Sequence, residues 1–142
     1  MKITLKRKDN DFHFETRNER GHVVHIDHKG KEEQAKGPSP MELVLMGVAG
    51  CSAIDVVSIL KKQRQEITSY TAEVIGERIE VGGAKPFKDI YVTIALKGDI
   101  APEKALRAAK LSFEKYCSVS KTLEPTATIH YKVILNDKEL EA

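Results

Sequence analysis

The sequence is poor in cysteine, and the two cysteines that it contains are far apart. Cys51 and Cys117 are the only ones in 142 residues, so the chain has no CxxC pair and neither a zinc-ribbon nor a thioredoxin signature. A strong excess of charge is also missing: 23 basic and 21 acidic residues leave a net charge of +2, and the basic residues are scattered. This excludes the basic patch typical of nucleic-acid or anionic-membrane binding. We therefore expect no nucleic-acid partner and no membrane partner.

The sequence also lacks long apolar runs. The segment from Met1 to Asn10 has no run of signal-peptide length, and no stretch approaches the roughly 20 apolar residues needed to cross a bilayer. We therefore expect a cytoplasmic protein. Because cytoplasmic thiols are kept reduced, any pairing of Cys51 with Cys117 is expected to be transient and chemical rather than structural.

Proline and glycine are scarce, with 5 and 9 residues, while 41% of the chain is apolar and 31% is charged. This composition is typical of a folded soluble protein and excludes a disordered one. A chain of 142 residues can bury one core but not two independent ones. We therefore expect a single domain that spans residues 1–142.

The hydrophobic pattern in the first half of the chain predicts a β-meander followed by a long helix. Short alternating segments fill residues 1–27, and the polar residues 28–37 are expected to form an exposed loop. Ser39, Pro40 and Glu42 together mark a helix start, because Ser39 can cap the helix and Glu42 can complete a capping box. The following residues, 43–60, are apolar on almost every face, which predicts a helix buried on all sides, partly by a partner subunit.

The second half predicts two strands, a helix and a last strand. Residues 70–81 and 88–96 alternate as strands of a hairpin, in which Gly76 is interpreted as a bulge and Gly82 and Gly83 as the turn. A second helix starts at Pro102 and ends near Cys117, before a polar turn, and residues 126–135 form the C-terminal strand. This order of elements indicates the α+β class.

Neither cysteine, taken alone, reveals its role. Cys51 is surrounded by small residues, which favours either a nucleophilic thiolate with room for a small substrate or a buried core cysteine. Cys117, at the end of the second helix, is open to the same two interpretations. Sequence spacing does not show whether the sulfurs meet, since a disulfide requires Cα atoms within about 7 Å.

Two motifs resemble those of the OsmC/organic-hydroperoxide-resistance (Ohr) family. One runs from Gly37 through Pro38-Ser39-Pro40-Met41-Glu42-Leu43 and leads into Gly50-Cys51, and the other is Tyr116-Cys117-Ser118-Val119-Ser120. The resemblance covers nearly the whole chain and includes the order of elements. It implies an OsmC-like fold in an intertwined homodimer, with two central helices packed between sheets.

The resemblance also implies a mechanism for reducing a small organic hydroperoxide. Cys51 would attack the peroxide as a thiolate and become a sulfenic acid, and Cys117 would resolve this acid to a disulfide. An external dithiol or thiol would then restore the pair by exchange. We expect no cofactor and no metal ion. The alternative is a non-catalytic member of the same fold that senses redox state or binds a small apolar ligand.

Charged residues that assist Cys51 are also implied by the resemblance. Glu42 matches a family glutamate that holds an arginine against the reactive sulfur, although a helix cap explains Glu42 equally well. Arg20 is the first choice for this arginine and Arg17 the second, with a solvated turn as the alternative for both.

Other polar residues are weaker candidates. His22, His25 and His28 do not favour a metal site, because a spacing of three in a strand places successive rings on opposite faces. Asp55 and Glu114 could pair as acid and base, but solvated or capping roles are favoured for both.

Overall fold

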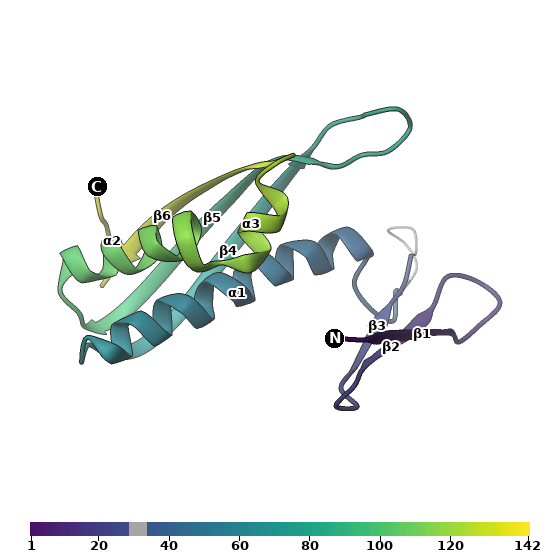
Figure 1. The fold of residues 1–142 in the computed structure, drawn as a ribbon, viewed down its shortest axis with the longest axis horizontal. Helices are drawn as coiled ribbons and strands as arrows, with labels where there is room; N and C mark the ends of the chain where they lie inside the picture. The colour runs from purple at the N-terminus through teal and green to yellow at the C-terminus, as the bar shows by residue number, and fades with distance from the viewer. Residues whose placement is uncertain (29–33) are drawn as a thin grey trace. The chain divides into compact units, whose positions relative to one another are not determined.

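The computed structural model describes residues 1–28 and 34–142, which form two compact units, residues 1–44 and 45–142 (Figure 1). Both helices and antiparallel and parallel strands are present, which confirms the α+β class. The loop expected at residues 28–37 lies partly outside the described residues, since residues 29–33 are not among them. The expectation of a single domain stays a prediction.

The N-terminal unit contains the expected β-meander. Its strands β1 (Ile3–Arg7), β2 (Phe14–Asn18) and β3 (Val23–Ile26) form an antiparallel sheet in the order β1-β2-β3. Gly21, in the turn between β2 and β3, has a φ of 85°, a conformation that glycine adopts at little cost.

Helix α1 (Pro40–Lys62) begins where the sequence predicts. The Ser39 N–H donates to Glu42 Oε1 at 2.9 Å, and the Glu42 N–H donates to Ser39 Oγ at 3.2 Å, so the capping box is present. By length and composition α1 could cross a membrane, as core helices of soluble proteins also could. The expectation that no segment approaches such a length is therefore wrong for α1.

The second unit contains a sheet with the order β4-β5-β6-β7. Its strands are β4 (Glu66–Arg78), β5 (Phe87–Asp99), β6 (Thr128–Leu135) and the short β7 (Lys138–Glu139), which the sequence analysis did not predict. Strands β4 and β5 form the expected antiparallel hairpin, whereas β5 and β6 are parallel. Parallel neighbours require a crossover, so the chain between them must pass over one face of the sheet.

Two glycine predictions have different outcomes. Gly82 and Gly83 lie in the hairpin turn with φ values of 56° and 89°, as expected. Gly76 is not a bulge, because it pairs regularly with Ile90 and the register shifts lie elsewhere in the hairpin. A Cβ at Gly76 would lie only 2.4 Å from Cε1 of Phe87, so glycine is needed there for close packing.

The crossover consists of three helical segments: α2 (Pro102–Leu111), the π-helical turn η1 (Ser112–Tyr116) and α3 (Ser118–Leu123). The sequence predicted one helix that ends at Cys117 and a polar turn after it. The polar turn is wrong, because Cys117 is the N-cap of α3 and its sulfur accepts a hydrogen bond from the Ser120 N–H.

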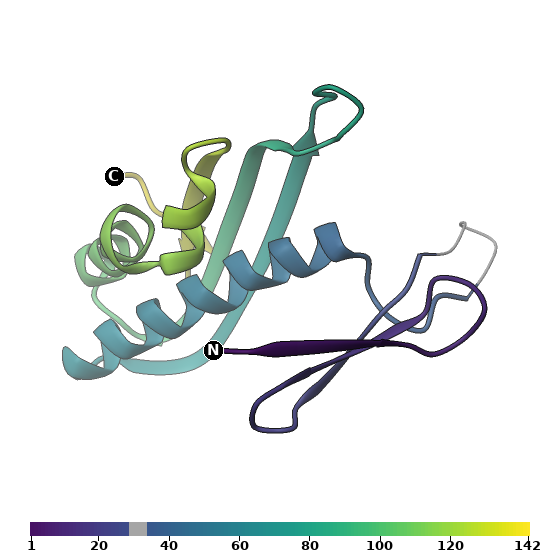
Figure 2. The same ribbon diagram turned by 45° about the vertical axis from the view of Figure 1, so that its right-hand side comes forward.

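The core of this unit lies between one face of the sheet and the helices. In two views 45° apart, α1, α2 and α3 lie over the same face (Figures 1 and 2). The core side chains come from alternate positions of β5, from every fourth position of α1 and from α2: Ile90, Val92, Ile94, Leu96, Val48, Ser52, Val56, Leu60, Ala105, Ala108 and Ala109.

The single chain leaves part of α1 uncovered, as expected from its apolar residues on almost every face, and burial of this part by a partner subunit stays a prediction. Met46 is 53% exposed and Ile54 is 73% exposed, although both are large and apolar. A single sheet covers only one face of a helix, which leaves the other apolar face of α1 uncovered.

Candidate thiol site

The structure brings the two cysteines together. Cys51 lies on α1 and Cys117 lies between η1 and α3, and both are free thiols. Their sulfurs and a carboxylate oxygen of Asp55 all lie within 4.8 Å of one another. The helix that crosses over the sheet therefore carries Cys117 to the middle of α1, a contact that sequence spacing could not reveal.

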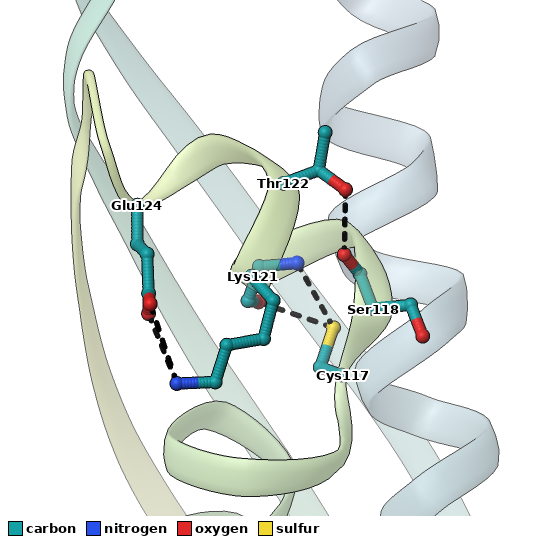
Figure 3. Close-up of polar contacts among 6 residues, drawn as sticks. Cys117, Ser118, Lys121, Thr122 and Glu124 are labelled. Carbon is teal, nitrogen blue, oxygen red and sulfur yellow. Dashed lines mark hydrogen bonds and ion pairs between the residues drawn. The ribbon is translucent and has the colours of Figure 1, made fainter.

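Cys117 is fully buried and its sulfur accepts two hydrogen bonds (Figure 3). The Ser120 hydroxyl donates at 3.1 Å and the Ser120 N–H donates at 3.4 Å. Burial raises the pKa of the Cys117 thiol, the two Ser120 hydrogen bonds lower it, and the neighbouring Cys51 raises it further, with a net increase. Cys117 is therefore a protonated thiol at neutral pH.

Cys51 differs from Cys117 in its exposure. It is only partly buried, on the face of α1 next to the stripe of core residues. A small reactant from solvent can therefore reach the Cys51 sulfur more easily than the Cys117 sulfur. This difference favours Cys51 as the thiol that reacts first and Cys117 as the thiol that reacts second.

Asp55 belongs to the same cluster, although its place in the sequence favours a solvated or capping role. Asp55 follows Cys51 by four residues, so the two side chains share one face of α1. The hydroxyl of the buried Ser112 donates to Asp55 Oδ2 at 3.0 Å. Asp55 does not cap a helix, and it is half-buried and bound by Ser112 rather than fully solvated; its i,i+4 spacing from Cys51 is visible in the sequence but does not by itself mark it as part of a site.

The π-helical turn η1 connects Asp55 to Cys117. The Cys117 N–H donates to the Ser112 carbonyl at 2.7 Å, across five residues. Ser112 thus binds the Asp55 carboxylate with its side chain and the Cys117 backbone with its carbonyl group. Single π-helical turns within helices are frequent at functional sites, because they adjust the direction of one segment without ending the helix.

The charged residues expected near Cys51 belong to the N-terminal unit. Glu42 makes the capping box, and hydrogen bonds from the Ser39 backbone, and secondarily from its side chain, hold the pKa of Glu42 below its usual value. The Arg20 N–H donates to Asn18 Oδ1 at 3.1 Å in the turn before β3, and Arg17 forms an ion pair with Glu15 at 2.6 Å. The role of Glu42 and Arg20 beside Cys51 stays a prediction.

A hollow of about 650 Å³ lies along the exposed face of α1. Its lining comes from α1 and β4: Ala53, Ile54, Val57, Ser58, Lys61, Lys62 and Tyr70. The Tyr70 hydroxyl is buried and has no hydrogen-bond partner among residues 1–28 and 34–142, and burial raises its pKa. The hollow is largely apolar and lies between the exposed side of α1 and Tyr70 of β4.

Comparisons with known proteins give the same fold. Protein YhfA from Escherichia coli strain K12 is 41% identical over 117 residues, which are 80% of this chain and 84% of that protein. An OsmC-like protein from Mycoplasma pneumoniae superimposes with a TM-score of 0.81 at 17% identity, over 94% of this chain and 95% of that one. The organic hydroperoxide resistance protein OhrB of Bacillus subtilis superimposes with a TM-score of 0.61 at 21% identity, over 95% of this chain and 96% of that one.

These similarities confirm the OsmC-like fold that the two sequence motifs indicate. The model of the family described as OsmC-like protein matches residues 30–132, which contain both cysteines, all of α1 and the whole crossover. The chain therefore belongs to the OsmC-like protein family.

Proposed function

We propose that this protein reduces organic hydroperoxides with Cys51 as the nucleophile and Cys117 as the resolving thiol. The observation that carries the proposal is the distance between the two sulfurs, which is at most 4.8 Å although the residues are far apart in the sequence. A disulfide between them then needs only a small further approach.

The proposed reaction has two steps. In the first, the Cys51 thiolate attacks one peroxide oxygen, the O–O bond breaks, and the alkoxide leaves as an alcohol after it takes up a proton. In the second, the Cys117 sulfur attacks the sulfur of the Cys51 sulfenic acid, and the Cys117 proton leaves with the hydroxyl group as water. An external dithiol or thiol reduces the resulting disulfide by exchange.

The different environments of the two thiols support these roles. Cys51 is partly exposed, so a peroxide can approach it, while the buried Cys117 is shielded from direct oxidation. The raised pKa of Cys117 keeps its proton in place until the second step, where water formation consumes that proton. The name of OhrB, which shares the fold, supports organic hydroperoxides as the substrate class.

Charged residues from the N-terminal unit complete the proposal. Glu42 orients an arginine that favours the Cys51 thiolate, and Arg20 is our first choice for this arginine, with Arg17 as the alternative. Glu42 performs this role in addition to capping α1. The transient disulfide fits a reducing compartment, so we place the protein in the cytoplasm.

The test is a thiol titration of the reduced protein before and after one equivalent of cumene hydroperoxide. We expect rapid loss of both thiols and a peptide pair joined by a Cys51–Cys117 bridge in mass spectrometry. A Cys51→Ser variant serves as the control and should keep its remaining thiol. Slow loss of thiols in the wild type, at the rate of this control, would overturn the proposal.

The hollow along α1 favours a second candidate function, in which the protein binds a small apolar ligand and does not turn over hydroperoxides. Its volume lies within the range of about 300–1,000 Å³ that is common for small-molecule sites, and its lining is largely apolar. In this case cumene hydroperoxide leaves the thiols intact on the time scale of the titration. Replacing Ile54 by tryptophan to fill the hollow would then abolish ligand binding without changing the reactivity of Cys51.

A further inference from the structure

We propose that Cys51, Asp55 and Cys117 together bind a thiophilic divalent cation, with Zn²⁺ as the best match, when both thiols are reduced. This inference goes beyond peroxide reduction and does not depend on it. It also departs from the sequence-based expectation that the protein binds no metal ion. The three residues come from two separate helical segments, and one ligand atom of each lies within 4.8 Å of the other two.

The spacing of these atoms suits a tetrahedral ion. With zinc–sulfur bonds of about 2.3 Å and zinc–oxygen bonds of about 2.0 Å, neighbouring ligand atoms lie roughly 3.5–3.8 Å apart. Each pair in the cluster therefore needs to close by at most about 1.3 Å, a shift that side-chain rotation provides. Three protein ligands leave the fourth position for water, as in zinc sites that are not purely structural.

The chemistry of the donors selects the kind of ion. Two sulfurs favour Zn²⁺ and other thiophilic ions over Mg²⁺ and Ca²⁺, which prefer oxygen ligands. Two thiolates and a carboxylate at these distances would repel one another without a cation, and a divalent ion offsets most of that repulsion. The Asp55 carboxylate beside the two sulfurs would therefore add a third anionic ligand to a bound divalent ion.

Hydrogen bonds behind the ligands already orient two of them. The Ser112 hydroxyl holds Asp55 Oδ2 at 3.0 Å, which leaves the other carboxylate oxygen for the ion. The Ser120 hydroxyl and N–H both donate to the Cys117 sulfur. Such second contacts fix the direction of the ligands and are typical of metal sites in proteins.

The site depends on the redox state of the cysteines. Binding replaces the proton of each thiol by a bond to the ion, and both protons go to solvent. Formation of the Cys51–Cys117 disulfide takes two electrons from the sulfurs, removes both as strong ligands and releases the ion. The cation and a hydroperoxide therefore compete for the same two sulfurs.

The test is a titration of the reduced, metal-free protein with Co²⁺ in the absence of oxygen, because Co²⁺ reports its ligands by absorption. We expect one equivalent to produce a thiolate-to-cobalt charge-transfer band and the visible bands of tetrahedral cobalt, and Zn²⁺ to abolish both. Absence of the charge-transfer band would overturn the proposal, and so would a band that persists in the protein with a preformed disulfide.

Two matched variants test the third ligand. Asp55→Asn keeps the size of the side chain and an oxygen for Ser112 but removes the charge, so we expect cobalt affinity to fall by about tenfold or more. Asp89→Asn removes the carboxylate on β5 that binds His130 and should leave the affinity unchanged. Equal affinities for Asp55→Asn and the wild type would exclude Asp55 and refute the three-residue site.

Thermal melts of each variant show whether the fold is retained. If Asp55→Asn is unstable, Cys51→Ser provides a second test, because it should lose the charge-transfer band. Peroxide consumption is measured separately on the metal-free wild type. Cobalt binding without consumption of cumene hydroperoxide would support this inference and contradict the proposed function. Consumption of cumene hydroperoxide without cobalt binding would contradict this inference and support the proposed function.

Discussion

At the residue scale, the two sulfurs have unequal access to solvent, which predicts unequal effects of replacing them. Cys51→Ser should abolish peroxide turnover, because no other thiol can reach the substrate, whereas Cys117→Ser should permit one round of oxidation and stop at the sulfenic acid. Single-turnover kinetics with mass detection of the sulfenic acid checks both. Equal, slow oxidation of the two variants would mean that Cys51 is not the primary nucleophile.

Ser120 should lower the pKa of the Cys117 thiol. Its hydroxyl and N–H both lower the pKa of Cys117, and the Ser120→Ala change removes the hydroxyl donor, so the pKa of Cys117 should rise further. The measurement is the pH dependence of Cys117 alkylation in a Cys51→Ser background. Ser118→Ala, in the same turn but without a contact to the sulfur, is the control and should leave the profile in place. An unchanged profile for Ser120→Ala would contradict the prediction.

Both cysteines are recognisable in the sequence, but the residues that connect them are not. The cysteines stand in motifs that can be recognised, whereas Asp55 and Ser112 meet only because α1 and η1 pack against each other. A hydrogen bond between residues so distant in the chain leaves no local pattern. The spacing of Asp55 from Cys51 was visible in the sequence, but helical spacing alone did not distinguish it from a surface carboxylate.

At the element scale, the start of α1 gives a test that separates two roles of Glu42. Glutamine can still accept the Ser39 N–H, so Glu42→Gln should cost well under the ~1 kcal/mol of a lost cap at neutral pH. The pKa of Glu42 is lowered in the folded protein, so its contribution to stability is present above the unfolded-state pKa and is lost as the pH falls through the folded-state pKa. Thermal melts at several pH values should therefore show the two proteins converging in acid.

The same substitution tests the proposed arginine. If Glu42 orients an arginine beside Cys51, both Glu42→Gln and Arg20→Ala should move the alkylation profile of Cys51 to higher pH, because a positioned cation favours the thiolate. A shift in Glu42→Gln alone would point to Arg17. Unchanged profiles in both variants would reduce Glu42 to a helix cap and Arg20 to a turn residue.

Elements were predictable where local chemistry marks them. Ser39 and Glu42 define the start of α1, and the glycine pair at positions 82 and 83 defines the hairpin turn. The π-helical turn and α3 were not predictable, because the polar sequence after Cys117 is equally typical of a loop and becomes helical by packing over the sheet and by the Ser120 hydrogen bonds.

At the scale of the whole molecule, the uncovered face of α1 predicts a homodimer. Met46 and Ile54 are large, apolar and more than half exposed in the single chain, and large exposed apolar patches on soluble proteins usually mark interfaces. Light scattering at micromolar concentration should give twice the chain mass, and Ile54→Glu should shift it toward the monomer. A monomer mass for the wild type would contradict the prediction.

The α+β class and most of the element order were predictable from hydrophobic periodicity and turn residues. The parallel pairing of β5 with β6 was not, because strand direction depends on the path of the crossover rather than on any pattern within the strands. The extent of burial on α1 was not predictable from the chain either, since apolar composition shows what a helix must bury but not which molecule covers it.

The position of the two sulfurs also has a consequence for chain entropy. A bridge between Cys51 and Cys117 would close a loop of roughly 66 residues, which restricts the unfolded chain and, in the loop-closure model, raises the free energy of unfolding by about 4 kcal/mol. Each oxidation would therefore make the molecule markedly harder to denature, and each reduction would reverse the change. Urea denaturation of the oxidised and reduced forms should show this difference, and the midpoint would then report the redox state of the protein without any chemical label.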